Sequence, residues 1–98
     1  MRKHNTTLNG AAWPESTKLA VWEKGTIIPG YPKEVWRRDK CGAAMKYSDH
    51  GDRTSKYGWE IDHIIPVSKG GSDHLVNLQP LHWENNLAKG DSLNWNCK

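Results

Sequence analysis

The sequence contains no phenylalanine and only two cysteines among its 98 residues. The pair Cys41 and Cys97 makes neither a disulfide framework nor a paired zinc motif, so we expect a protein that does not depend on disulfides, although one bridge between them is left open. Long apolar runs are also missing, since no stretch approaches the roughly 18 apolar residues of a membrane helix and no signal peptide is recognised. These absences predict a soluble, cytoplasmic chain with no membrane partner.

Six tryptophans supply much of the apolar side-chain volume that phenylalanine does not. A chain of 98 residues has room for one domain, and such a small domain buries only a modest share of its unfolded surface. A few large indoles therefore dominate the expected core, and each carries an N–H group that needs a hydrogen-bond acceptor when it is buried.

Positive charge exceeds negative charge only slightly. Lys and Arg together number 14 against 11 Asp and Glu, which gives a net charge of +3 and a pI near 9.0. This balance suits a polyanionic partner such as nucleic acid, but many unrelated proteins are equally basic.

The first half of the chain predicts an arm followed by helices. Residues 1–10 are polar and aperiodic, which is typical of a flexible arm. Pro14 suits a first helical position, with Leu19, Ala20 and Trp22 on one face and Gly25 at the end. Residues 32–38 predict a second short helix, which Gly42 ends.

Arg37 and Arg38 fall at the end of that second segment, beside Trp36. Two readings stay open at this point: contact with a nucleic-acid phosphate, or an ordinary solvated helix face.

The second half predicts a strand, a loop, a strand and a helix. Residues 57–61 favour a strand that runs into Asp-His, and residues 70–73 form a turn. Residues 76–79 predict a short returning strand. Residues 81–89 predict a helix with Gly90 at its C-cap.

The two motifs of this half are Tyr-Gly-Trp-Glu-Ile-Asp-His-Ile-Ile-Pro at 57–66 and Asn-Leu-Gln-Pro-Leu-His-Trp-Glu-Asn-Asn at 77–86, with Lys89 beyond. Asn77 stands 14 positions after His63, and Asn86 stands 23 positions after it. This pattern resembles the active site of HNH endonucleases, and its spacing is similar to that of the HNH domain of CRISPR effector nucleases.

The resemblance implies an α+β fold in which a ββα-metal core, about residues 57–90, carries an N-terminal helical layer within a single nuclease domain, 11–98. It further implies that Asp62 and Asn86 hold one divalent metal ion. Both offer hard oxygen ligands and no thiolate is present, so we expect Mg²⁺ or Mn²⁺.

The other motif residues take roles from the same resemblance. His63 is the implied general base that deprotonates the attacking water, and Asn77 ties the connecting loop together and helps to fix that imidazole. Lys89 lies one turn beyond Asn86 and either contacts a phosphate oxygen of the DNA or is a solvated lysine near a helix end.

The chain departs from the family pattern at the zinc positions. Many HNH proteins carry two Cys-x-x-Cys pairs around a structural zinc, whereas here Cys41 is followed by Ala44, and the second pair would fall at His82 and Asn85. We therefore expect no structural zinc. His82 is interpreted as a helix-start residue near Trp83, with a third metal ligand as the alternative.

The resemblance thus implies a metal-dependent hydrolase of double-stranded DNA that nicks one strand per active site. A double-strand break would need two nicks or a homodimer, and the oligomeric state, monomer or homodimer, stays open. Small free-standing proteins of this kind are often phage products linked to DNA packaging, so a packaging partner is a further suggestion. The alternatives are a non-catalytic nucleic-acid-binding module and an RNase or structure-specific nuclease.

Overall fold

The computed structural model describes residues 3–97, so Met1 and Arg2 of the predicted arm and Lys98 at the end of the predicted domain lie outside the described residues. The elements are α1 Glu15–Trp22, β1 Thr26–Ile27, β2 Trp36–Arg38, β3 Ala44–Lys46, β4 Trp59–His63, β5 Leu78–His82 and α2 Trp83–Lys89. Helices combined with antiparallel sheets agree with the expected α+β class. No helix within 3–97 is long and apolar enough to cross a membrane.

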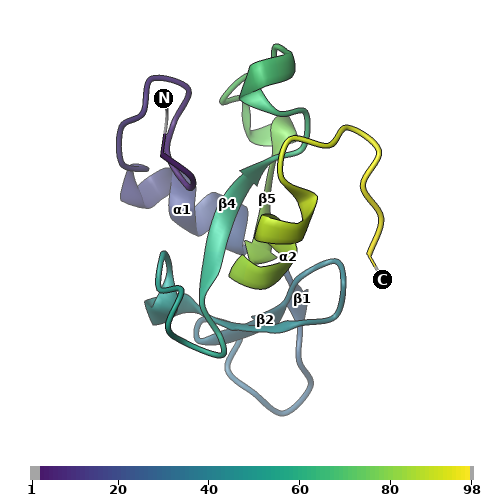
Figure 1. Cartoon of the computed structure of the whole chain (residues 1–98). Helices are drawn as coiled ribbons and strands as arrows, with labels where there is room; N and C mark the ends of the chain where they lie inside the picture. Colours follow the sequence, from purple (N-terminus) through teal and green to yellow (C-terminus); the bar gives the residue numbers. More distant parts are fainter. Residues whose placement is uncertain (1–2, 98) are drawn as a thin grey trace.

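The antiparallel pair β4–β5 forms the centre of the molecule and lies between α1 and α2 (Figure 1). Side chains of β4 alternate between its two faces, as in any strand. Trp59 and Ile61 belong to the hydrophobic cluster that also contains residues of α1, whereas Glu60 and Asp62 contact side chains of α2. One strand thus supplies both the core and a polar face.

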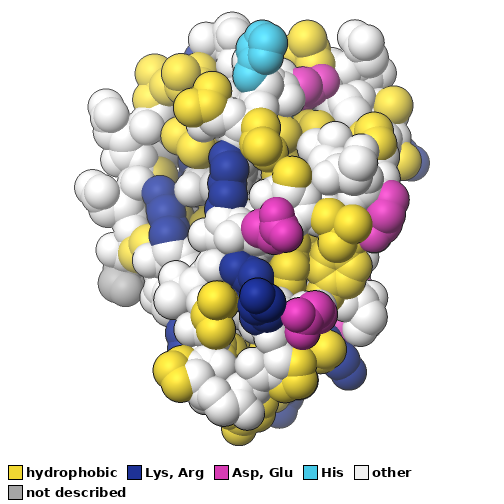
Figure 2. Space-filling model, turned by 180° about the vertical axis from the view of Figure 1, so that it is seen from behind, with side chains coloured by type: hydrophobic (Ala, Val, Ile, Leu, Met, Phe, Trp, Pro, Cys, Tyr) yellow, Lys and Arg dark blue, Asp and Glu magenta, His cyan; other side chains and the backbone are white. Residues whose placement is uncertain are grey.

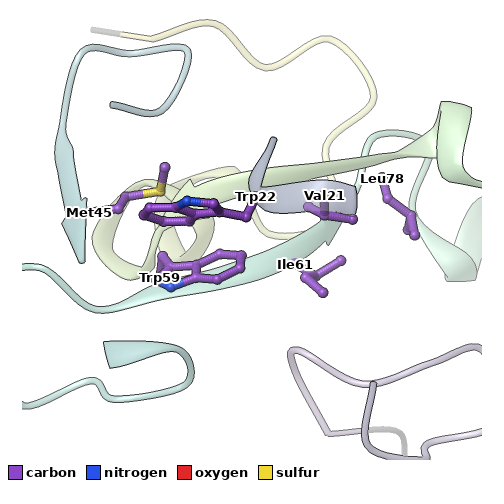
Figure 3. Packing of buried hydrophobic residues seen from close by; sticks show 6 residues of the cluster. All are labelled: Val21, Trp22, Met45, Trp59, Ile61 and Leu78. Atoms are coloured by element: carbon purple, nitrogen blue, oxygen red, sulfur yellow. The ribbon is translucent and has the colours of Figure 1, made fainter. Parts of the chain in front are cut away.

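Indoles from two elements form the middle of the core (Figure 3). The rings of Trp22 and Trp59 lie 5.0 Å apart between centroids, and the smaller apolar side chains of the cluster are Val21, Met45, Ile61 and Leu78. Trp22 Nε1 donates to Lys33 O at 2.9 Å, and Trp59 Nε1 donates to Tyr47 O at 3.1 Å. The expectation that buried indoles would need acceptors is met at these two positions.

The prediction of a second helix over residues 32–38 is wrong. Only one turn follows Pro32, after which β2 pairs with β1 on one side and β3 on the other. β2 is therefore the middle strand of a three-stranded sheet, and its two neighbours bind its backbone groups. Pairing with distant segments overrides the local helical pattern, so the predicted helical layer consists of α1 and this small sheet.

The remaining elements agree with the prediction to within a few residues. Pro14 is the N-cap of α1 rather than its first helical residue, and Val21 and Trp22 are its buried residues while Leu19 is exposed. β5 begins at Leu78 because the preceding residues, Leu75–Asn77, form a 3₁₀ turn. Gly90 caps α2, as expected.

The predicted arm contacts β4. Asn5 Oδ1 accepts a hydrogen bond of 2.7 Å from Ile61 N, and His50 Nε2 lies 3.2 Å from the same oxygen. His4 Nε2 lies 3.3 Å from Glu60 Oε2. The described part of the arm therefore lies along the strand that leads into Asp-His.

His50 makes the stability of this region depend on pH. Its ring lies 4.8 Å from that of Trp59, and burial lowers its pKa from 6.5 to about 4. The unfolded chain therefore takes up the extra proton first, and the free energy of unfolding falls as the pH is lowered from about 6.5 towards 4. We expect His50→Gln to remove about 1–2 kcal/mol of this acid-induced fall in the free energy of unfolding. The effect is smaller than the pKa shift alone would give, because the ring keeps some contact with solvent.

Urea denaturation at pH 7 and pH 4.5 measures this difference, with His74→Gln as the control because His74 is exposed. An unchanged pH dependence in His50→Gln would show that other groups cause the acid loss.

Candidate active site

A pocket of about 340 Å³ opens beside the end of β4. Its walls come from the arm, the loop before β4, β4 itself, the loop after it, α2 and the residues just after α2: His4, Asn5, Arg53, Ile61, Asp62, His63, Pro66, Asn86, Leu87, Gly90 and Asp91. The structure thus brings Asp62, His63 and Asn86 to one pocket, although Asn86 is 23 residues from His63 in the sequence.

Asp62 is a buried carboxylate with two defined partners. Its side chain is 6% exposed, Gln79 Nε2 donates to Oδ2 at 2.9 Å, and Lys89 Nζ lies 3.2 Å from Oδ1. Gln79 reaches it because the two residues face each other across the β4–β5 pair. Burial raises the pKa of Asp62, and the hydrogen bonds from Gln79 and Lys89 oppose this rise.

Lys89 is the buried ion-pair partner of Asp62 and not a charge on the surface. Its side chain is 3% exposed, and Nζ also donates to His63 O at 3.0 Å. Lys89 therefore fastens the last turn of α2 to the strand end that carries Asp-His. The alternative of a solvated lysine is wrong, and contact with a DNA phosphate would require the ammonium to leave its buried position.

Asn86 is oriented by Glu60, a carboxylate that the sequence reasoning missed. Asn86 Nδ2 donates to Glu60 Oε1 at 2.7 Å, which turns the carboxamide oxygen of Asn86 away from Glu60. Arg53 in turn binds both oxygens of Glu60, at 2.7 and 2.9 Å. Burial acts to raise the pKa of Glu60, but these hydrogen bonds hold it below its usual range. Its place two residues before Asp62, on the same strand face, was the available signal.

His63 points to the opposite side of β4 from Asp62. Its ring is buried, lies 5.6 Å from the Trp13 ring between centroids, and has Nε2 at 2.8 Å from Asp73 Oδ1. The sequence predicted only a turn at Asp73, because nothing local indicates which side chain a turn carboxylate will meet.

Asn77 closes the loop between β4 and β5. Its Oδ1 accepts from Ile65 N at 2.8 Å, and its Nδ2 donates to Ile65 O at 3.1 Å and to Ser72 O at 2.8 Å. Gly71 lies so close to Ile65 that a Cβ atom would come within 1.7 Å of the carbonyl oxygen of that residue. This buried amide therefore orders the loop, and its part in fixing the His63 imidazole stays a prediction.

The two arginines lie away from the pocket, on β2. Arg37 is 8% exposed and donates to the carbonyl oxygens of Lys33, Glu23 and Gly25. Its guanidinium thus binds inside the fold, and the predicted contact with a phosphate would require it to leave these three carbonyl oxygens. Arg38 is exposed and donates to Gly42 O at 2.9 Å, so its contact with DNA stays a prediction.

His82 caps α2 instead of facing the pocket. Its Nδ1 accepts from Glu84 N at 3.1 Å, and Nε2 lies 2.7 Å from Lys56 O. One neutral tautomer, with the proton on Nε2, satisfies both contacts. The interpretation of His82 as a helix-start residue is therefore preferred over that of a third metal ligand.

Cys41 and Cys97 form the disulfide that the sequence left open, with their Cα atoms 5.4 Å apart. Within residues 3–97, no group of three or more His, Cys, Asp or Glu side chains is placed to hold a metal ion. The side-chain oxygen donors at the pocket are the carboxylates of Asp62 and Asp91 and the carboxamides of Asn5 and Asn86, and Asn5 Oδ1 already accepts a hydrogen bond from Ile61 N. These are the donors that a hard divalent cation prefers, with water completing its coordination.

Comparison with known proteins agrees with this geometry. The family model described as HNH endonuclease matches residues 40–92, which include β4, β5 and α2. No curated protein and no solved structure gives a significant match. Because the match spans more than half of the sequence and includes every pocket residue that the motifs indicated, the chain belongs to the HNH endonuclease family.

Proposed function

We propose that this protein is a divalent-metal-dependent DNA endonuclease whose active site is the pocket between β4 and α2. The observation that carries the proposal is the convergence of a buried carboxylate, an imidazole and an oriented carboxamide on one pocket: Asp62, His63 and Asn86. HNH domains generally use a divalent metal and act on DNA, so the family supports both parts. Residues 11–98 would form the nuclease domain, with β4, β5 and α2 as its ββα-metal core.

Asp62 and Asn86 are the residues that would hold the metal, and Mg²⁺ or Mn²⁺ suits their oxygen donors. When bound, the ion supplies Lewis-acid stabilisation of the phosphate and of the leaving oxygen. The hydrogen bond from Asn86 to Glu60 positions the carboxamide in advance, because the bound Nδ2 fixes where Oδ1 can lie.

His63 would accept the proton of the attacking water. It lies on the other side of the strand from Asp62, so the base and the metal ligand approach the pocket from different directions. Lys89 would keep Asp62 ionised in spite of its burial, since a buried carboxylate without a cation nearby favours its protonated form.

One such site cuts one strand, so we propose that a monomer nicks duplex DNA. The face opposite to that of Figure 1 carries Lys and Arg side chains interspersed with acidic ones (Figure 2). A mixed surface of this kind does not form a continuous basic track. With a net charge of only +3, affinity for DNA would rest on a few phosphate contacts and fall as the salt concentration rises.

Two neighbouring asparagines of α2 provide a matched test of the metal site. Asn86 Nδ2 binds Glu60 at the pocket, whereas Asn85 Nδ2 binds Asp39 at 2.9 Å, and Asn85 is not among the residues that line the pocket. Each alanine variant loses one hydrogen bond to a carboxylate. We expect Asn86→Ala to raise the Mg²⁺ or Mn²⁺ concentration for half-maximal nicking of supercoiled plasmid by about 10–100-fold or more, and Asn85→Ala to leave it near wild type.

Wild-type nicking should be abolished by EDTA and restored by excess metal. Plasmid binding without cleavage at any metal concentration would instead indicate a non-catalytic binding module. Preferential cleavage of RNA or branched DNA would redirect the proposal to an RNase or a structure-specific nuclease.

A further inference from the structure

We infer that Asp73 is the positioning residue of His63: its carboxylate fixes the tautomer and the orientation of the imidazole. The inference rests on the proposed function, in which His63 is the general base. Asp73 Oδ1 lies 2.8 Å from Nε2 of His63, and the imidazole itself is 4% exposed. A buried ring has few other partners with which to satisfy this nitrogen.

The hydrogen bond determines which nitrogen can act as the base. A carboxylate only accepts, so the neutral imidazole must carry its proton on Nε2 to bind Asp73. Nδ1 is then the nitrogen with a free lone pair, and it is the atom that takes the proton from water. Without Asp73 the ring would divide between two tautomers, and a share of the molecules would present the wrong nitrogen.

Asp73 is itself held from two directions. Both of its oxygens accept from Leu8 N at 3.0 Å, across 65 positions of sequence. The preceding residue, Ser72, is fixed by the hydrogen bond from Asn77 to its carbonyl oxygen. The arm and the ordered loop therefore meet at the carboxylate that contacts His63.

Trp13 limits the movement of the imidazole from another side. Its ring lies 5.6 Å from that of His63 at an interplanar angle of 41°. Packing on one side and a hydrogen bond at Nε2 together fix the ring plane more tightly than either contact alone.

Asp73 could instead serve only to fasten the arm, and the two roles can be separated. Leu8→Pro removes the N–H that binds Asp73 but leaves the contact with His63. Asp73→Ala removes both contacts. Asp73→Asn keeps an acceptor oxygen while it loses the negative charge.

The first measurement is the single-turnover cleavage rate at saturating protein, together with the dissociation constant for DNA. We expect Asp73→Ala to lower the rate by about 10–100-fold with little change in DNA binding, and Asp73→Asn to fall between it and wild type. Leu8→Pro should stay within a few-fold of wild type. Equal rates for Asp73→Ala and wild type, or an equal loss in Leu8→Pro, would overturn the positioning role.

The second measurement does not need activity. Long-range ¹⁵N–¹H spectra of the metal-free protein should show the His63 proton on Nε2 in wild type and in Leu8→Pro, and a mixture of tautomers in Asp73→Ala. An unchanged tautomer in Asp73→Ala would contradict the inference. Inactive wild type with this tautomer shift would overturn the proposed function alone, which keeps the two failures distinct.

Discussion

Replacing His63 with alanine should lower the single-turnover rate of plasmid nicking by about 10²–10⁴-fold, the usual contribution of a general base. The other histidine that lines the pocket, His4, lies with Nε2 3.3 Å from Glu60 Oε2, and Asp62 is engaged by Gln79 and Lys89, so neither simply replaces His63 as the base. DNA binding should change little, since His63 is buried and contributes no surface charge to the complex. Rates at saturating protein and gel-shift titrations separate the two effects.

His74→Ala is the matched control, because it makes the same substitution at an exposed histidine of the neighbouring loop. It should cleave at nearly the wild-type rate. Added imidazole should restore part of the activity of His63→Ala, since the substitution leaves a space beside Trp13 and Asp73. Equal activity of His63→Ala and wild type would exclude His63 as the base.

The resemblance to HNH endonucleases indicated Asp62, His63 and Asn86 of the pocket, and the local strand and helix patterns placed these residues on the elements that carry them. Asp62 and His63 occupy opposite faces of a strand by simple alternation, and Asn86 and Lys89 share a helix face at a spacing of three. The strand–loop–strand–helix order then follows from the turn residues between them. Each of these features depends only on residues within one short segment of the sequence.

The residues that the sequence missed depend on distant partners. Glu60 matters because Arg53 and Asn86 meet it, and Asp73 matters because the loop and the arm bring it to His63. Arg37 was misplaced for the same reason, since its strand exists only between two others. Apart from the place of Glu60 on the same strand face as Asp62, no local pattern indicates these long-range contacts.

Loss of the Cys41–Cys97 disulfide should lower the free energy of unfolding by about 4 kcal/mol, the loop-entropy value for cysteines 56 positions apart. The described residues after α2 form no helix or strand, and the bond fastens this tail to the body of the protein together with Lys40 Nζ, which lies 5.6 Å from the centroid of the Trp95 ring. A small domain has about 5–15 kcal/mol of stability, and this loss is a large part of it. Urea denaturation with and without a reductant, and of the double variant Cys41→Ala/Cys97→Ala, measures the effect.

The reductant should not change the urea midpoint of the double variant, which separates loss of the bond from a general effect of the reagent. Equal midpoints for oxidised and reduced wild type would contradict the prediction. Disulfides persist in oxidising compartments, so a protein in the cytoplasm would work at the lower stability. The residues that would hold the metal are placed by other contacts: Asn86 of α2 binds Glu60 of β4 directly, and Lys89 of α2 binds Asp62 of β4. Where the reduced protein is still folded, its nicking rate should therefore match that of the oxidised protein.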